Sequence, residues 1–168
     1  MSILQTAILS SFNDCVKSLV KDRQAEGNKI VAVLSAIIDK ISDIIPKIEI
    51  IADRLPLQLK EKLIQQIASL LEPSNQITEE RLAQEVVLLV NRTDIKEEID
   101  RLKAHINTAQ ELLNSNEAIG RRLDFLCQEL NRETNTICSK SAEIELTNYG
   151  IQLKALIEQF REQVQNID

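Results

Sequence analysis

The stretch GRRLDFLCQELNRETNTICSKS, residues 120–141, has the clearest structural pattern in the chain. Its apolar residues recur every three or four positions, as on one side of a helix: Leu123, Leu126, Cys127, Leu130 and Ile137. The other sides mix acids, bases and amides instead of the alternating Lys and Glu of a merely solvated face. We therefore predict one amphipathic helix that buries its apolar stripe and presents a hydrogen-bonding or metal-binding face.

The composition of the 168-residue chain favours an all-α fold. With only 3 Gly, 3 Pro and 2% aromatic residues, the chain has little material for tight hairpins or strand cores. The hydrophobic content of 43% excludes wholesale disorder.

A second apolar pattern spans the first half of the chain. It follows a heptad rhythm through Ile30, Leu34, Ile37, Ile41, Ile44, Ile48, Ile51 and Leu55, after a separate predicted helix over residues 2–20. Pro46 should kink or split this segment, and Leu55-Pro56 is typical of a reversal into a further helix ending near Leu71. We predict a long helical hairpin over residues 1–75.

Residues 72–76, Glu-Pro-Ser-Asn-Gln, are the clearest break in the sequence, and we place a domain boundary there. Residues 76–168 then form a C-terminal domain of about three amphipathic helices. The first of these runs from Thr78 to about Leu113, and residues 114–117 form a loop before the stretch at 120–141. A last apolar seam extends from Leu146 to Ile167.

Charge and cysteine usage limit the possible environments. The first half is balanced, so residues 76–168 carry the whole net charge of −6, which disfavours nucleic-acid binding by a uniformly basic surface. The three cysteines lack CxxC spacing and are expected to be small buried residues in a reducing compartment. With no signal peptide and no long apolar run, we expect a cytoplasmic protein with no membrane partner.

Two polar stripes could carry chemistry. Asp94, Glu98, Arg101 and His105 share one helix face, and Glu129 and Glu133 lie one turn apart with Arg122 and Lys140 near the same stripe. Paired carboxylates can share a divalent cation, while a guanidinium contacts phosphate and a histidine transfers a proton. From the residues alone, an ion-paired surface is the commoner interpretation of the first stripe, and a subunit interface or a solvated face is the commoner interpretation of the second.

Several familiar chemistries have no support in the sequence. It contains no Gly-rich phosphate loop, no nucleophile elbow, no HExxH motif and no Cys/His zinc spacing. Few aromatic side chains are free to stack on nucleic-acid bases, because all of them lie on predicted core stripes: Phe12, Phe125, Phe160 and Tyr149.

Three segments together resemble the C-terminal helical domain of the YicC/YloC-like endoribonucleases. They are RLAQEVVLLVNRTDIKEEIDRLKAHI (81–106), GRRLDFLCQELNRETNTICSKS (120–141) and IEQFREQVQNID (157–168). The earlier part resembles the family's middle helical region more loosely, with Arg23, Glu26 and Gly27 in its R-E-G element.

This resemblance implies a metal-dependent bacterial endoribonuclease that uses manganese or magnesium and forms a homo-oligomer, a hexamer in the complete protein. On this basis, we assign catalytic roles to His105, Glu129, Glu133 and Arg132. We expect RNA phosphates to contact Arg101, Arg122, Lys140 and Lys154. The candidate metal ligands are Glu98, Glu129, Glu133 and Asp124.

Family members also begin with a β-containing N-terminal domain that nothing before Ile3 supplies. We therefore expect a truncated protein with an introduced start. Whether this chain is active without the missing domain is an open question. Two alternative functions are an oligomerisation module, in which the polar motif holds subunits together, and an RNA adaptor without catalysis.

Overall fold

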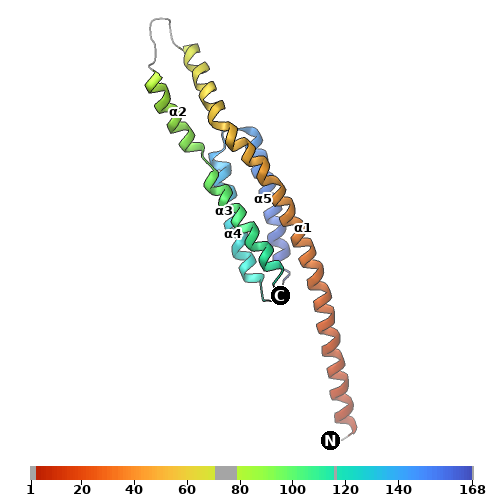
Figure 1. The fold of residues 1–168 in the computed structure, drawn as a ribbon. Coiled ribbons are helices and arrows are strands. Elements are labelled where there is room, and N and C mark those ends of the chain that lie inside the picture. Colours follow the sequence, from red (N-terminus) through yellow and green to blue (C-terminus); the bar gives the residue numbers. More distant parts are fainter. Residues whose placement is uncertain (1–2, 71–78, 116, 168) are drawn as a thin grey trace.

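The computed structural model describes residues 3–70, 79–115 and 117–167, and this part of the chain contains five helices and no strand (Figure 1). They are α1 (Ile3–Leu70), α2 (Glu79–Thr93), α3 (Lys96–Leu113), α4 (Gly120–Lys140) and α5 (Ile144–Val164). The predicted all-α class is confirmed, as is the helix predicted at residues 120–141. No described helix combines the length and apolarity needed to cross a bilayer.

Helix α1 is continuous, so the predicted reversal at Leu55-Pro56 and the separate helix over residues 2–20 are wrong. Both Pro46 and Pro56 lie inside it on exposed positions. Each proline removes one backbone hydrogen bond, at a cost of about 3 kcal/mol. The heptad seam is buried on both sides of Pro46, and each buried Ile or Leu contributes about 1.5–3 kcal/mol, so packing outweighs the interruption.

The single helix predicted from Thr78 to Leu113 is also wrong, because it is broken at Asp94 and Ile95. A carboxylate oxygen of Asp94 accepts a hydrogen bond from the backbone N–H of Lys96 at 3.0 Å, which offers the chain an alternative to helical bonding. Ile95 is fully buried. The break therefore lets Ile95 enter the core before α3 begins at Lys96.

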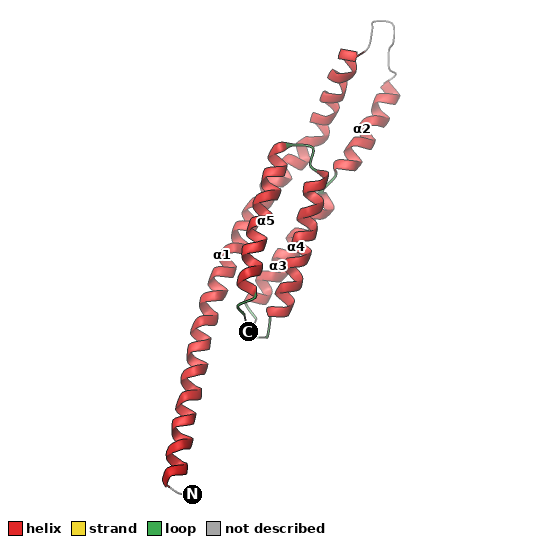
Figure 2. Cartoon of the chain, turned by 180° about the vertical axis from the view of Figure 1, so that it is seen from behind, coloured by secondary structure: helices red, strands yellow, loops and turns green. Residues whose placement is uncertain are grey.

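The middle of α1 forms a four-helix bundle with α3, α4 and α5 (Figure 2). Helix α1 packs on α3 and α5, while α4 packs on the same two helices, and one continuous apolar core joins all four. Helices from both predicted domains thus share this core. The predicted boundary at 72–76 lies outside the described residues, and the division into two domains stays a prediction.

The first part of α1 extends beyond the bundle as a lone helix (Figure 1). Its apolar side chains have no neighbour in the described chain, so Phe12 is 64% exposed and its predicted place in a core is wrong. Phe125 on α4 is also exposed, contrary to the same prediction, whereas Phe160 is fully buried.

The three cysteines are free thiols in different surroundings. The predicted burial is confirmed for Cys127, where burial raises the pKa of the thiol to about 12, and Cys138 is half-buried. It is wrong for Cys15, which lies exposed on the lone part of α1.

The contact between α4 and α5 is close at Gly150. A methyl group on Gly150 would overlap the sulfur of Cys138 but lie 3.8 Å from its Cβ, an ordinary contact. We expect Gly150→Ala to lower the free energy of unfolding by about 1–2 kcal/mol, because overpacking exceeds the gain in helix propensity. In a Cys138→Ala background the same change should instead stabilise, by about 1 kcal/mol. Urea unfolding of the parent chain and the three variants tests this, and equal effects in both backgrounds would contradict it.

Candidate metal centre

Three metal-binding side chains meet where α3 and α4 run side by side. They are His105 from α3 and Glu129 and Glu133 from α4. One ligand atom from each lies within 4.8 Å of the others. Glu129 and Glu133 are one turn apart on the same helix, and α3 supplies the imidazole opposite them because the two helices are antiparallel.

The donor set is chemically suited to a divalent transition metal. Imidazole nitrogen and carboxylate oxygen together fit manganese and its neighbours, whereas magnesium prefers oxygen ligands and retained water. His105 and Glu129 are half-buried, while Glu133 is only 3% exposed. A divalent ion held by these three side chains would have coordination positions left for water or a phosphate oxygen.

Arg101 lies beside the buried member of this group. Its Nη1 is 3.5 Å from Oε1 of Glu133, and its Nη2 donates a hydrogen bond to Glu97. The carboxylates of Glu97 and, to a smaller extent, Glu133 raise the pKa of the Arg101 guanidinium. About half of the Arg101 side chain is exposed, so it partly compensates the buried charge of Glu133 and still reaches solvent.

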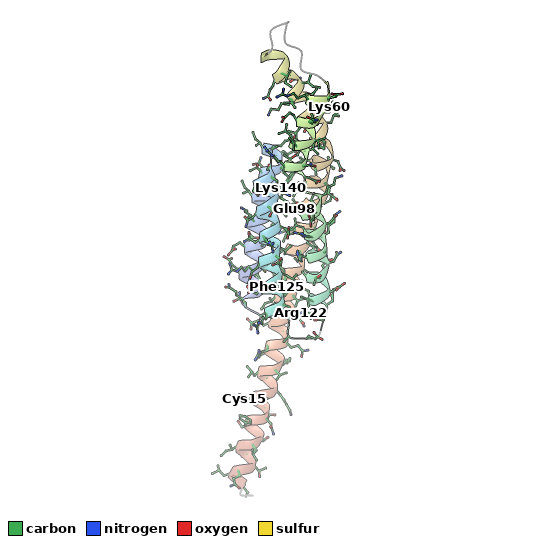
Figure 3. The ribbon with its side chains drawn as sticks, turned by 90° about the vertical axis from the view of Figure 1, so that its left-hand side faces the viewer. Cys15, Lys60, Glu98, Arg122, Phe125 and Lys140 are labelled. Atoms are coloured by element: carbon green, nitrogen blue, oxygen red, sulfur yellow. The ribbon has the colours of Figure 1, made fainter. Side chains whose placement is uncertain are left out.

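Glu98 and Lys140 form a separate ion pair at the end of α4 (Figure 3). Lys140 Nζ donates to Oε1 of Glu98 at 2.9 Å and to the backbone carbonyl of Asp94, also at 2.9 Å. Glu98 is 6% exposed, and its Oε2 has no hydrogen-bond partner in the described part of the chain. Lys140 therefore neutralises a buried acid and holds the break between α2 and α3.

We expect Lys140→Met to lower the free energy of unfolding by about 2–3 kcal/mol, because it leaves the buried Glu98 carboxylate without its cation. Lys96→Met is the matched control. Its pair with Asp53 lies on the surface, so its loss should change stability by less than about 1 kcal/mol. Equal effects of the two changes in urea unfolding would contradict this assignment.

The remaining predicted site residues lie around the group or away from it. Arg132 is 3.9 Å from Glu129, at the edge of the group. Asp124 accepts a hydrogen bond from Gln128 and faces Arg161 of α5 at 3.9 Å. Neither Asp124 nor Glu98 belongs to the group, and the geometry does not favour their predicted role as metal ligands.

Two more of the residues predicted to contact phosphate, Arg122 and Lys154, form no ion pair with His105, Glu129 or Glu133. Arg122 is 3.3 Å from Glu117, in the turn before α4. Lys154 is exposed on α5 and forms no ion pair with a described residue. Their contact with RNA stays a prediction.

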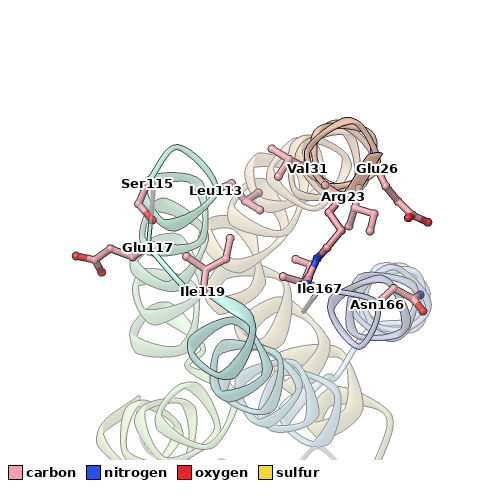
Figure 4. Close-up of a pocket in the computed structure, with 11 residues that line it drawn as sticks. Arg23, Glu26, Val31, Leu113, Ser115, Glu117, Ile119, Asn166 and Ile167 are labelled. Atoms are coloured by element: carbon pink, nitrogen blue, oxygen red, sulfur yellow. The ribbon is translucent and has the colours of Figure 1, made fainter. Parts of the chain in front are cut away.

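A pocket of about 560 Å³ lies at the other end of the bundle. Helix α1, the turn between α3 and α4 and the chain after α5 surround it (Figure 4). Arg23, Glu26 and Gly27 line one side, and Ser115 contributes a buried hydroxyl without a hydrogen-bond partner among described residues. None of the predicted metal ligands lines it.

Comparison with known proteins decides the family. The family model "Endoribonuclease YicC-like, C-terminal" matches residues 48–168, which include α2 to α5 and all the candidate metal ligands. The chain belongs to the YicC-like endoribonuclease family. The resemblance predicted from the polar motifs is thereby confirmed.

Two YicC-like relatives match along nearly the whole chain. A probable endoribonuclease YicC from Clostridioides difficile is 37% identical over 166 residues, which are 99% of this chain and 57% of the relative. A probable endoribonuclease YicC from Haemophilus influenzae is 35% identical over 164 residues, 96% of this chain and 55% of the relative. The chain thus spans a little over half the length of these relatives.

In this YicC-like chain, Phe125 is one of the residues whose predicted burial is wrong, together with Phe12 and Cys15. Phe125 was predicted to join the core, yet it is 59% exposed on α4. A signal was present, since Phe125 shares a helical stripe with Arg121, Gln128 and Arg132, at spacings of four, three and seven residues. These neighbours on the stripe are all polar, whereas Leu126 has Leu123 three residues before it and Leu130 four residues after it.

Proposed function

We propose that this chain carries the RNA-cleaving site of a metal-dependent endoribonuclease, with a divalent ion held by His105, Glu129 and Glu133. The observation that carries the proposal is the convergence of these three ligand atoms within 4.8 Å. The name of the relatives, probable endoribonuclease, supplies the class of substrate. Manganese suits the mixed nitrogen and oxygen donors better than magnesium does.

Each side chain around the group has a role in this proposal. A bound divalent ion supplies charge neutralisation at phosphate and a lowered pKa for bound water. Glu129 and Glu133 provide the carboxylates that would hold a cation, and the Arg101 guanidinium lies 3.5 Å from the buried Glu133 carboxylate. Arg101 and Arg132 project exposed guanidinium groups from the two helices, where they can bind phosphate oxygens.

In this proposal His105 acts both as a metal ligand and as a proton-transfer group. One ring nitrogen belongs to the ligand group, and the other remains able to hold a proton. The attacking group is either water or the RNA 2′-hydroxyl. The products separate these routes, because only attack by the 2′-hydroxyl leaves a 2′,3′-cyclic phosphate.

Manganese titration into a cleavage assay tests the proposal. This chain and the complete C. difficile relative receive the same labelled single-stranded RNA, first with a chelator and then with rising Mn²⁺. We expect no product with the chelator and metal-dependent product with Mn²⁺. Binding without product at every metal concentration would favour the RNA adaptor, and cleavage that persists under chelation would contradict the metal site.

The exposed part of α1 favours a second role, self-association. Ile3, Leu4, Ile8, Phe12, Val16 and Leu19 are large apolar side chains without a described neighbour. We propose that they pack against a second copy of the chain. Light scattering on the Phe12→Glu and Leu19→Glu double variant should give a smaller mass than the parent chain, whereas an unchanged mass would contradict this role.

A further inference from the structure

Phe125 is an exposed aromatic residue on an otherwise polar surface. Its neighbours in sequence, Leu126 and Cys127, enter the core, but Phe125 points away from it and remains 59% exposed. Figure 3 places Phe125 with Arg122 towards one end of α4, away from Lys140 at the other end. The exposed part of the Phe125 ring offers a flat apolar face against which a planar ligand can pack.

The residues along the same stripe of α4 are suited to a polyanion. Arg121 lies one turn before Phe125, and Gln128 and Arg132 follow at three and seven positions. Arg121 is exposed and forms no ion pair with any described residue. Arg132 is 71% exposed, and its ion pair with Glu129 is long, at 3.9 Å. Two arginines therefore flank the ring with their charge available to phosphate groups.

The stripe continues into the candidate metal centre. Glu129 is four residues after Phe125, so their Cβ atoms are about 6 Å apart on the helix surface. A strand whose phosphate is bound by Arg132, beside Glu129, can thus place a neighbouring base over the Phe125 ring. Duplex RNA keeps its bases stacked inside, and only an unpaired base can make this contact.

We propose that Phe125 is a stacking platform for an unpaired base of single-stranded RNA, with Arg121 and Arg132 binding the adjoining phosphates. This inference rests on the proposed function and adds to it a preference for single-stranded RNA. The site takes single strands with little regard to base identity, because every base offers a π-face and no base-edge contact is needed.

The test is the affinity of single-stranded RNA for the chain, measured by fluorescence anisotropy under chelation so that the probe stays intact. The probe is a labelled twelve-nucleotide oligouridine, and a backbone-matched abasic strand is its control. Phe125→Leu should weaken oligouridine binding about tenfold or more but leave the abasic strand unaffected. Phe125→Tyr keeps an aromatic ring and should stay within about twofold of the parent.

The outcomes separate this inference from the function beneath it. If the parent chain cleaves RNA and Phe125→Leu binds oligouridine equally well, the stacking role fails and the metal site stands. If the parent binds neither strand and cleaves nothing, both proposals fail. A fall in assembled mass for Phe125→Leu would identify the ring as a contact between proteins and overturn the inference.

Discussion

Glu133→Gln is expected to lower the rate of Mn²⁺-dependent RNA cleavage on the order of 100-fold or more. Glu133 is the most buried of the three proposed ligands, and its carboxylate is shared between the group and Arg101. The amide keeps the shape of the side chain but removes the charge that a cation needs. Single-turnover cleavage of a labelled single strand at saturating Mn²⁺ measures the effect.

Glu111→Gln is the matched control for this change. Glu111 lies exposed on α3 and forms no ion pair with a described residue, so its loss should leave the cleavage rate within about twofold. A Glu133→Gln variant that cleaves as fast as the control would show that Glu133 is not a ligand. A smaller assembled mass would instead indicate that Glu133 maintains subunit contacts.

Phe160→Ala is expected to lower the free energy of unfolding by about 3–5 kcal/mol. Phe160 is fully buried on α5, within the core that α1, α3, α4 and α5 share. Removing the ring loses its burial and leaves a cavity that rigid helices fill only in part. Urea unfolding followed by circular dichroism measures the change.

Phe125→Ala makes the same chemical change at an exposed position. Because the Phe125 ring lies 59% exposed, its removal should alter the free energy of unfolding by less than about 1 kcal/mol. Similar losses for the two variants would contradict the placement of Phe125 outside the core, and with it the stacking surface.

Much of the fold could be predicted because side-chain periodicity reports which face of a helix is buried. The heptad seam from Leu34 to Leu55 is buried as predicted, and so is the stripe of α4. Proline propensity misled at Pro56, where α1 continues to Leu70 and packs against α2. The break at Asp94 was missed because it depends on the burial of Ile95, which is a tertiary effect.

The candidate site could be predicted only within single helices. Spacing brought Glu129 and Glu133 together on one face, but the pairing with His105 depends on the register between α3 and α4, which no local pattern encodes. The same register places Glu98 opposite Lys140 instead of with the other acids. Phe125 was assigned to the core because an aromatic residue at helical spacing is usually buried.

Metal binding tests the central claim most directly. Isothermal titration of Mn²⁺ into this chain should give one site per chain. His105→Ala and Glu129→Gln should each weaken that site about tenfold or more, while Glu111→Gln leaves it unchanged. Unchanged Mn²⁺ affinity in both ligand variants, or no Mn²⁺ binding by the parent chain, would contradict a metal centre built from His105, Glu129 and Glu133.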